Sequence, residues 1–281
     1  MNISRSEAVR KYFTKTPTKP IESDYSSNQT RMGIGGGLLV FALIFLSSGQ
    51  GLLVLLGIAS GYFGFKFLSS GFSEYSKQKK EYEENCSQYE KDYERAEPKP
   101  SDEQMDQWMN ADLALILKES LRKLDLLEEG DYQAKPLVIG GPANLDETQY
   151  ASGRDGKVRY SHLNVLTVYL SDHNISTYQC THALIHGQTL SDSTQEFPYK
   201  EITNLQIKTI NKEIHLVNGR RDSVNGVQQF ALYTSGSNVI EVVFSFSRNA
   251  DQQDELVEIG SEDTIKAVRK KLEEYKKKYS R

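Results

Sequence analysis

Cysteine is scarce in this sequence, and the familiar catalytic motifs are missing. The two cysteines, Cys86 and Cys180, lie in different expected elements and form neither a redox motif nor a metal-binding pair, so nothing indicates a disulfide framework. The sequence has no Gly-x-Ser-x-Gly motif, no His-Glu-x-x-His motif, no Ser-His-Asp arrangement and no phosphate-binding loop. We therefore expect no enzyme activity, with no catalytic residues, no cofactor and no bound metal.

One short pattern could present metal ligands. The spacing of Cys180, His182 and His186 places all three side chains on one face of a strand. A structural zinc site takes four ligands, and no fourth is evident here. A polar hairpin strand accounts for the same residues, and it is the interpretation that we adopt.

Neither sign of charge dominates the chain. Its 34 lysines and arginines and 38 aspartates and glutamates leave a net charge of −4, which does not favour nucleic acid as a partner. The charges separate only near the end, where residues 251–263 are acidic and residues 266–281 are basic. Lys270 and Lys271 are candidates for an interaction surface on the polar face of an amphipathic helix. Contact of this basic stretch with nucleic acid or with an anionic membrane surface is the alternative.

The chain does have one long run without charge. The 34 residues between Arg31 and Lys66 carry no charged side chain. A single helix of this length would be about 51 Å long, whereas the hydrocarbon core of a bilayer is about 30 Å thick. Turn-forming residues at 47–51 divide the run. We expect a transmembrane hairpin over residues 32–68, with a single tilted helix or a re-entrant arrangement as the alternatives.

Glycines are concentrated in this run. Gly33 and Gly37 are four residues apart, as are Gly57 and Gly61, and Gly64 follows. This spacing lets helix backbones approach closely in lipid. We expect these glycines to pack the two hairpin helices together. The sharper alternative is that they drive association of several copies into a homo-oligomer or a pore.

Lysines and arginines flank the run on both sides, and its central turn has none. Positive charge close to the ends of a span favours the cytoplasmic side of the membrane. Both termini are therefore expected in the cytoplasm. Residues 1–31 are expected to form a mobile, basic cytoplasmic arm, with a short amphipathic stretch around residues 7–13.

The tyrosines after the hairpin are regularly spaced. Tyr75, Tyr82 and Tyr89 recur every seven residues in a charged helix expected at 69–97. This spacing is typical of a coiled-coil seam, although it spans only about three heptads and one seam position is a lysine. The three tyrosines are candidates for an interaction, either in a coiled coil or with the next helix of the same chain.

A second charged helix is expected after Pro98, where the first must end. Ser101 and Gln104 form a capping-box pattern, and apolar residues then recur at helical spacing until Gly130. We expect the two helices to pair antiparallel as a stalk over residues 69–130.

Beyond residue 135 the periodicity changes from that of helices to that of strands. Segments rich in Val, Ile, Tyr, Phe and Thr alternate with turns of Gly, Asn, Asp and Ser. A final amphipathic helix is expected at 262–279. The expected strands are 136–140, 158–170, 175–186, 195–209, 213–217, 227–234 and 239–247.

This order of six or seven antiparallel strands and one C-terminal helix resembles that of the pleckstrin-homology-like (PH/GRAM-like) family. Three short segments add to the resemblance: 168–175 (Val-Tyr-Leu-Ser-Asp-His-Asn-Ile), 197–202 (Phe-Pro-Tyr-Lys-Glu-Ile) and 267–272 (Ala-Val-Arg-Lys-Lys-Leu). The resemblance as a whole covers residues 155–279. The resemblance implies a small antiparallel PH-like β-barrel, closed at one end by the helix, within a domain of residues 131–281.

The resemblance also bears on ligands. Members of the family that bind phosphoinositides use basic residues in the first hairpin loop, whereas residues 172–174 are acidic to neutral here. Bacterial relatives mostly resemble interaction or assembly modules, and this is the role that the resemblance implies. Another small β-barrel or a β-sandwich is the alternative fold.

These features together predict a membrane-anchored α+β protein of a bacterial inner membrane, with a transmembrane hairpin, a helical pair and a PH-like barrel with its C-terminal helix. The expected role is a non-enzymatic adaptor or sensor, held at the lipid bilayer, that binds a protein partner, for example along an exposed sheet edge. The alternative is a membrane-perturbing effector, as in the cell-suicide proteins of phage defence, with an oligomerising hairpin gated by the cytosolic domain. A lipid- or nucleotide-binding module is a third class.

Overall fold

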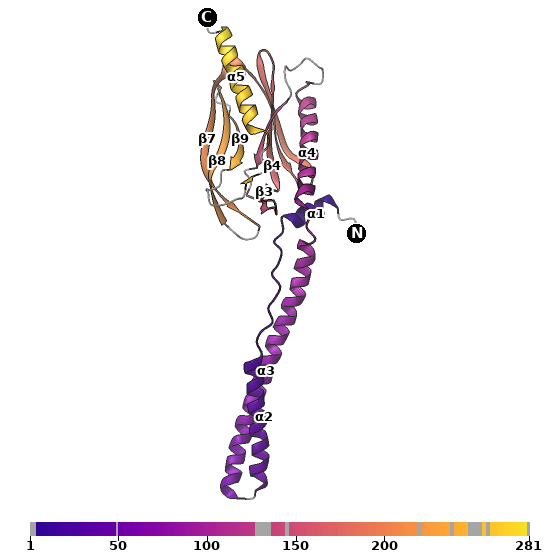
Figure 1. Cartoon of the computed structure of the whole chain (residues 1–281), viewed down its shortest axis with the longest axis vertical. Helices are drawn as coiled ribbons and strands as arrows, with labels where there is room; N and C mark the ends of the chain where they lie inside the picture. The colour runs from indigo at the N-terminus through magenta and orange to yellow at the C-terminus, as the bar shows by residue number, and fades with distance from the viewer. Residues whose placement is uncertain are drawn as a thin grey trace. The chain divides into compact units, whose positions relative to one another are not determined.

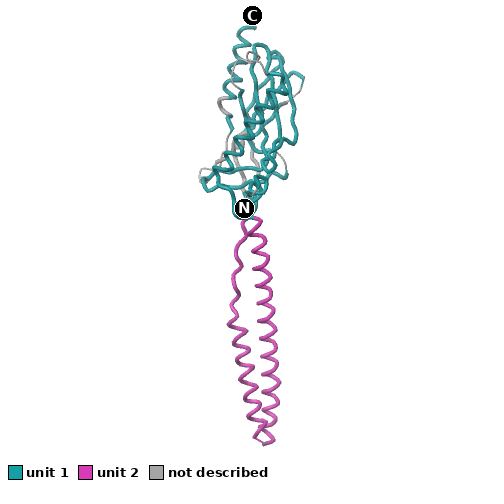
Figure 2. The backbone as a smooth tube through the Cα atoms, turned by 90° about the vertical axis from the view of Figure 1, so that its right-hand side faces the viewer, with its two compact units in different colours: residues 1–15, 96–281 teal, residues 16–95 magenta. Residues whose placement is uncertain are grey.

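The computed structural model describes residues 4–48, 50–126, 136–143, 146–217, 221–236, 239–246, 255–256 and 259–279. The chain forms two compact units (Figure 2). Unit 1 consists of residues 1–15 and 96–281, and unit 2 consists of residues 16–95. Unit 2 is therefore inserted into the sequence of unit 1 close to the N-terminus.

Unit 2 is a helical hairpin. Its helices α2 (Ser26–Ser47) and α3 (Gly51–Ala96) meet at a short turn in the expected place (Figure 1). Both helices are long and apolar enough to cross a membrane. α3 has 46 residues and is about 69 Å long, so the second expected span and the charged helix after it are one continuous helix.

The N-terminal helix α1 (Arg5–Tyr12) belongs to unit 1 and not to a mobile arm. Ser4 caps its first turn. The side chains of Val9, Tyr12 and Phe13 are buried in a core that they share with residues far along the chain. The structure differs from the expectation because this stretch places three large apolar side chains together, and their removal from water is favourable.

Helix α4 (Asp102–Lys123) begins as its sequence predicts. The Oγ of Ser101 accepts a hydrogen bond from the backbone N–H of Gln104 at 3.2 Å. The helix ends at Lys123, with Leu124 as its C-cap, so it stops short of the expected end at Gly130, a residue outside the described part of the chain. One face of the helix is buried in the core of unit 1, where it covers an apolar face of the sheet. The expected antiparallel pairing with the preceding helix stays a prediction. The buried residues on this face are Met105, Met109, Asp112, Ile116 and Ser120.

The described strands form three sheets. The first has the order β1-β4-β5-β6, with every pair antiparallel. The second has the order β10-β3-β2, in which β10 is parallel to β3, and the third has the order β7-β8-β9. The strands are β1 (Leu137–Pro142), β2 (Tyr150–Ser152), β3 (Lys157–Tyr160), β4 (His162–Leu170), β5 (Asn174–Ala183), β6 (Gln188–Pro198), β7 (Ile202–His215), β8 (Arg221–Thr234), β9 (Val239–Phe246) and β10 (Glu255–Leu256).

The closed barrel implied by the PH-like resemblance is not formed. At Pro198 the chain leaves β6, passes through a 3-10 turn (Tyr199–Glu201) and starts β7 in a different sheet. No ladder of hydrogen bonds joins β6 to β7 among the described residues. Antiparallel pairing is confirmed for the first and third sheets, but the expected closure is wrong.

The burial of β4 on both faces explains this difference. Leu163 and Val165 lie in one core with α1 and α4. Leu166 and Val168 lie in a second core with the third sheet and with the C-terminal helix α5 (Ser261–Tyr279). Figure 1 shows α4 on one side of β4 and the third sheet on the other. A barrel would leave the outer face of its strands in water, whereas a sheet in the middle of three layers buries apolar residues on both faces.

Replacing Phe13 by alanine should lower the free energy of unfolding of unit 1 by about 3 kcal/mol, because it removes a buried ring from the core that holds α1. The measurement is urea unfolding of the full chain in detergent, followed by the fluorescence of Trp108, the one tryptophan of the sequence. Trp108 packs against the same core.

The matched control is Phe72→Ala, at an exposed position of α3, which should change the free energy of unfolding by less than about 0.5 kcal/mol. Identical unfolding curves for Phe13→Ala and the unmodified chain would show that α1 is not docked.

Candidate functional site

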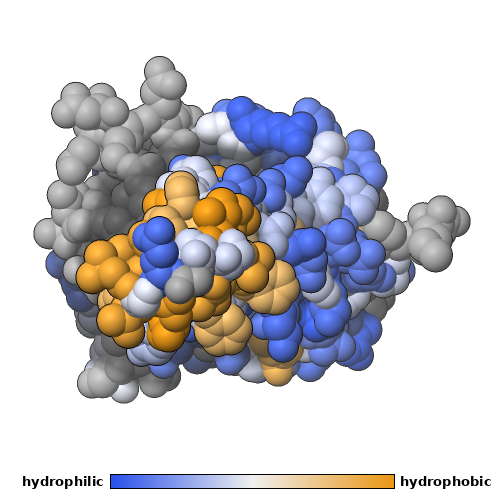
Figure 3. All heavy atoms as spheres, turned by 90° about the horizontal axis from the view of Figure 1, so that it is seen from below, coloured by the Kyte–Doolittle hydropathy of each residue, from blue (hydrophilic) through white to orange (hydrophobic). Residues whose placement is uncertain are grey.

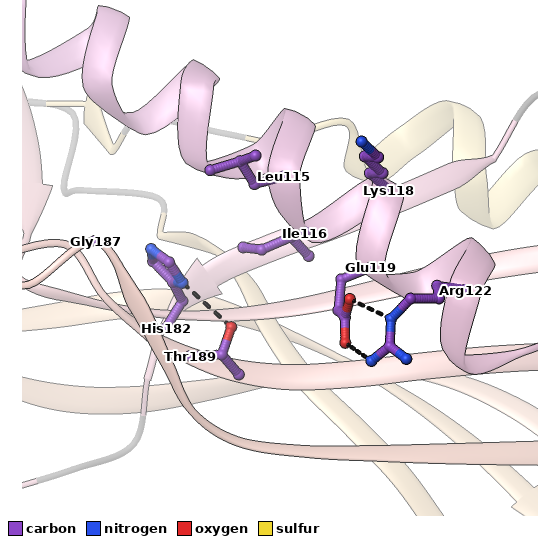
Figure 4. Close-up of a pocket in the computed structure, with 8 residues that line it drawn as sticks. All are labelled: Leu115, Ile116, Lys118, Glu119, Arg122, His182, Gly187 and Thr189. Atoms are coloured by element: carbon purple, nitrogen blue, oxygen red, sulfur yellow. Dashed lines mark hydrogen bonds and ion pairs between the residues drawn. The ribbon is translucent and has the colours of Figure 1, made fainter.

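A cleft of about 460 Å³ lies between α4 and the hairpin of β5 and β6 (Figure 4). Its accessible lining is mainly apolar, and a few polar groups converge on it. Binding sites for ligands typically combine these two properties, so the cleft is the candidate site of unit 1. The lining residues are Leu115, Ile116, Lys118, Glu119 and Arg122 of α4, and His182, Gly187 and Thr189 of the hairpin.

Of the charged groups of α4 that line the cleft, one cation has no ion-pair partner among the described residues. Arg122 donates two hydrogen bonds to the carboxylate of Glu119, from Nε at 2.8 Å and from Nη2 at 2.5 Å (Figure 4). Lys118 forms no ion pair with any residue that the structure describes. The cleft therefore offers an apolar surface with one ammonium group beside it.

Next to the cleft, a buried ionic cluster joins α1, α4 and β5. Arg5 of α1 donates a bidentate pair of hydrogen bonds to the carboxylate of Asp112, with Nη1 at 2.8 Å from Oδ1 and Nη2 bonded to Oδ2. The Nε2 atom of His182 lies 3.0 Å from Oδ2 of Asp112 but lacks the alignment of a hydrogen bond. The guanidinium of Arg5 also lies 5.8 Å from the ring centre of Trp108, in a cation–π arrangement.

Asp112 keeps its charge in this cluster although it is buried. Only 1% of its side chain is exposed, and burial by itself would raise the pKa of the carboxyl group. The contacts with His182 and Arg5 outweigh burial and lower the pKa of Asp112 below its ordinary value. The carboxylate thus attracts Arg5 strongly enough to hold α1 against α4 and β5.

Thr189, His182 and Asp112 form a line that resembles a nucleophile, a base and an orienting acid. The Nδ1 atom of His182 lies 3.4 Å from Oγ1 of Thr189, at the limit of a hydrogen bond (Figure 4). Asp112 is already bonded by Arg5, and Nε2 of His182 is not aligned with it. The described contacts therefore hold these three side chains in place.

A second buried network fixes the beginning of α4. Arg159 of β3 is 3% exposed and donates two hydrogen bonds of 2.8 Å to Asp106. It also donates to Asp155 at 2.8 and 3.1 Å and lies 3.5 Å from Asp102. Tyr12 of α1 donates a hydrogen bond to Asp102 at 2.7 Å. One buried cation that faces three carboxylates therefore joins α1, α4 and β3.

Sequence reasoning missed both networks. Arg5 and Asp112 are 107 residues apart, and Arg159 is 53 residues from Asp106. Neither distance leaves a local pattern in the sequence. The one available signal was Asp112 itself, a carboxylate at a core position of an otherwise apolar helical face.

The glycines predicted to pack the hairpin divide into two groups. A Cβ atom on Gly64 would lie 2.9 Å from the carbonyl oxygen of Gly35, and one on Gly57 would lie 3.1 Å from Leu46. The Cβ position of Gly61 is 3.5 Å from Cβ of Ala42. The structure thus places these three glycines at the contact between α2 and α3. The other two, Gly33 and Gly37, lie away from it, with no described atom within 4 Å of the Cβ position.

A seven-residue repeat, rather than the four-residue spacing, describes this contact. Small residues at this spacing let two helices approach along a constant seam. Asn28 extends the seam by donating from Nδ2 to Oε1 of Gln78 at 2.9 Å. The repeat consists of Asn28, Gly35 and Ala42 on α2, and Gly57, Gly64 and Gly71 on α3.

The tyrosines predicted as a coiled-coil stripe are half-buried on α3. The ring of Tyr75 meets the ring of Tyr25 edge to face, with centres 5.2 Å apart, and Tyr89 lies 5.7 Å from Tyr93. The chain before α2 runs alongside α3 in Figures 1 and 2. The stripe that also includes Tyr82 is therefore covered in part by its own unit.

Lys270 and Lys271 lie on α5 but face different surroundings. The Nζ atom of Lys271 is 3.9 Å from Oδ1 of Asp172, in the turn between β4 and β5. Lys270 is 80% exposed, with its Nζ atom 3.9 Å from Oε1 of Glu274. Asp172, the acidic residue that departs from the lipid-binding pattern of the PH-like family, thus lies beside α5.

Cys180, His182 and His186 do not come together as metal ligands. His182 is directed at Asp112 and Thr189. Burial raises the pKa of the Cys180 thiol to about 12, so the thiol stays protonated. In the described part of the chain, no three His, Cys, Asp or Glu side chains are arranged to hold a metal ion.

Comparison with known proteins adds no assignment to this geometry. No family model matches the chain, and no curated protein or solved structure matches it either. The PH-like resemblance stays a prediction, and the function has to be argued from the residues themselves.

An engineered disulfide should report the contact between α2 and α3. The Cβ positions of residues 42 and 61 are 3.5 Å apart, which suits a disulfide. In the full chain with Cys86→Ser, the pair Ala42→Cys and Gly61→Cys should therefore oxidise within one chain. Adding Gly64→Leu should abolish the cross-link, because a side chain there would collide with the backbone of α2.

Gly37→Leu is the matched control, since it makes the same change where space is free, and it should leave the cross-link intact. Mobility on a non-reducing gel measures the outcome. A main product that joins two chains would show that this helix face pairs copies of the protein instead.

Asp155 should stabilise the protein at neutral pH and lose this effect in acid. Its hydrogen bonds with Arg159 hold the pKa of Asp155 at about 2, whereas an aspartate of an unfolded chain has a pKa of about 3.9. The contribution is therefore fully present above about pH 4 and disappears as the pH falls toward 2. Asp155→Asn should lower the free energy of unfolding by about 1 kcal/mol at pH 7.

Urea unfolding at several pH values, read from Trp108 fluorescence, measures the effect. The difference between Asp155→Asn and the unmodified chain should shrink in acid. Asp146→Asn, at an exposed turn position, should show no such trend. A difference that stays constant down to about pH 2.5 would contradict the assigned role of Asp155.

Proposed function

We propose that this protein is a membrane-tethered, non-enzymatic adaptor or sensor. The hairpin of unit 2 crosses the inner membrane of a bacterium, and unit 1 stays at the cytoplasmic face, where it binds a protein partner. Tethering confines unit 1 to the membrane surface and so raises its effective concentration for partners at the same surface.

The observation that carries this proposal is the docking of α1. Val9 and Tyr12 precede the hairpin, yet they share a core with Met105 and Met109, which follow it. A folded core cannot be divided by a bilayer, which supports a topology with both ends of the hairpin on the same side of the membrane. Two spans and an uncharged turn fit this topology, and the basic flanks favour the cytoplasm.

The surface of the hairpin supports its placement in lipid. In the most apolar window of each helix, 11% of the residues are buried, which is unlike the core helix of a water-soluble protein. Leu43, Leu52 and Phe65 are 70%, 76% and 67% exposed. Figure 3 shows hydrophobic side chains gathered over the end of the hairpin. Proteins rarely leave so large an apolar surface in water, and a bilayer would cover it.

The packing of the hairpin favours an anchor over a membrane-perturbing effector. Gly57, Gly61 and Gly64 are used for contact between α2 and α3 of the same chain. A contact that is already occupied within the hairpin is not free to join several copies into a pore. The occupied contact therefore supports an anchor.

The chemistry of unit 1 favours binding over catalysis. The thiol of Cys180 is held protonated by burial, and Asp112 is bonded by Arg5. The accessible features are a mainly apolar cleft and an exposed strand, which suit recognition of another molecule.

Cysteine labelling of cells tests the proposed topology. In the full chain with Cys86→Ser, which keeps only the buried Cys180, a cysteine replaces in turn Ile21, Gln50 or Lys277, all of which are exposed. A maleimide that does not cross membranes should label Gln50→Cys in intact spheroplasts. It should label Ile21→Cys and Lys277→Cys only after lysis.

Labelling of Ile21→Cys and Lys277→Cys from opposite sides would overturn the proposed tether. The membrane potential of the same cells provides a second readout. If the full chain depolarises the cells and Gly57→Leu prevents this, the protein is an effector and not an adaptor.

A further inference from the structure

Strand β6 leaves a long free edge on the first sheet. The sheet ends at β6, and no described strand pairs with its outer side. Nine successive residues of this strand, from Gln188 to Glu196, are exposed. A bulge at Leu190 interrupts the pairing with β5, and from Ser191 to Pro198 the pairing is regular. Unpaired N–H and C=O groups along such an edge are a template for a further strand.

The cleft described above lies at the start of this edge. Thr189 of β6 and Gly187 in the turn before it belong to its lining, and α4 forms the opposite wall (Figure 4). A strand added beside β6 would lie about 4.8 Å from it, and alternate side chains of that strand would point toward α4. Domains that bind peptides by strand addition gain affinity from the backbone hydrogen bonds and specificity from pockets for alternate side chains.

We propose that β6 and the cleft bind an extended segment of a partner protein, which joins the sheet as a strand. One of its side chains is apolar and packs on Leu115 and Ile116, and another is a carboxylate that pairs with Lys118. This inference rests on the proposed adaptor role and names the class of partner that the adaptor binds.

The lining of the cleft determines this chemistry. Leu115 is 62% exposed, and an apolar side chain of a partner that covers it would be favourably removed from water. Lys118 is the cation of the cleft that no described residue pairs, whereas Arg122 is neutralised by Glu119. Residues 115 and 118 are about 5–6 Å apart on one face of the helix, and side chains two residues apart on a strand are about 6.7 Å apart. The segment should therefore carry its apolar and acidic residues two positions apart.

A second copy of the same chain fits this edge less well. β6 contains no basic residue, and its two carboxylates are Glu196 and Asp192, which Lys123 of α4 pairs at 3.0 Å, so two antiparallel copies would gain no pair of opposite charges across this edge. Its exposed apolar residue, Leu190, lies at the bulge and not in the regular part of the strand. The partner is therefore a different chain.

Peptide selection on the full chain in lipid nanodiscs tests the proposal. The probe is a library of random linear peptides of about ten residues. Selected peptides should share an apolar and an acidic residue two positions apart. Hydrogen exchange followed by mass spectrometry should then show slower exchange of the amides of β6 when such a peptide is bound. Methylation of alternate backbone nitrogens in the peptide should abolish binding in one register and preserve it in the other.

Two variants and a matched control locate the contact. Leu115→Asp and Lys118→Glu, both at exposed positions, should each weaken peptide binding about tenfold or more. Lys277→Glu reverses a charge at an exposed position of α5 that does not line the cleft, and it should leave the affinity unchanged. The fluorescence of Trp108 confirms that each variant is folded.

A library that yields no binder, or binders that slow exchange elsewhere than in β6, would overturn the proposal. Protection of β6 that rises with protein concentration without peptide would assign the edge to a second copy and would overturn it as well. Each of these outcomes leaves the labelling test of the membrane tether unaffected, so failure of the binding site and failure of the proposed tether are distinguishable.

Discussion

Arg5 in the first helix meets Asp112 in the fourth, with the whole hairpin between them in the sequence. The guanidinium and the carboxylate are partly or fully removed from water, where an ion pair survives only with good geometry and further partners. Both conditions hold, because the pair is bidentate and His182 and Trp108 surround it. Together with the apolar side chains of α1, this contact closes unit 1 across the inserted hairpin. The proposed tether depends on this closure, because it brings segments on either side of the hairpin into one core.

The first sheet lies in the middle of unit 1, and this position determines which of its faces and edges are covered. Because β4 is buried on both faces, α4 can cover one face while the third sheet and α5 cover the other. At the start of β6, α4 does not cover the sheet completely, and the cleft lies between the helix and the strand. An edge of this kind suits an adaptor, because backbone pairing supplies affinity without a preformed deep pocket. In the hairpin, small residues at every seventh position let α2 and α3 pack closely. The large apolar side chains of the two helices face outward.

Local signals in the sequence were sufficient for several elements. The uncharged run with its central turn predicts the two helices of the hairpin, the capping pattern at Ser101 predicts the start of α4, and the spacing of Ile265, Val268 and Leu272 predicts α5. The glycines were predicted less well, because the four-residue spacing that includes Gly37 is weaker evidence of contact than the seven-residue repeat through Gly35. The cleft was not predicted, since its two walls are far apart in the chain.

The sequence alone determined where charge is absent, how the flanks of the hairpin are charged, and which parts of the chain are mainly helical or mainly strand. These properties depend on neighbouring residues, so they can be read from short windows. The sequence did not determine where strands end, because the expected strands 158–170 and 195–209 are each divided between two sheets. Only the tertiary structure decided that α1 is docked, that α4 covers a sheet, that the sheets stay open and that β6 is a free edge. Each of these outcomes depends on which apolar faces and which buried charges find each other across many residues, and burial on both faces of β4 is the physical reason that the barrel expected from the strand order does not close.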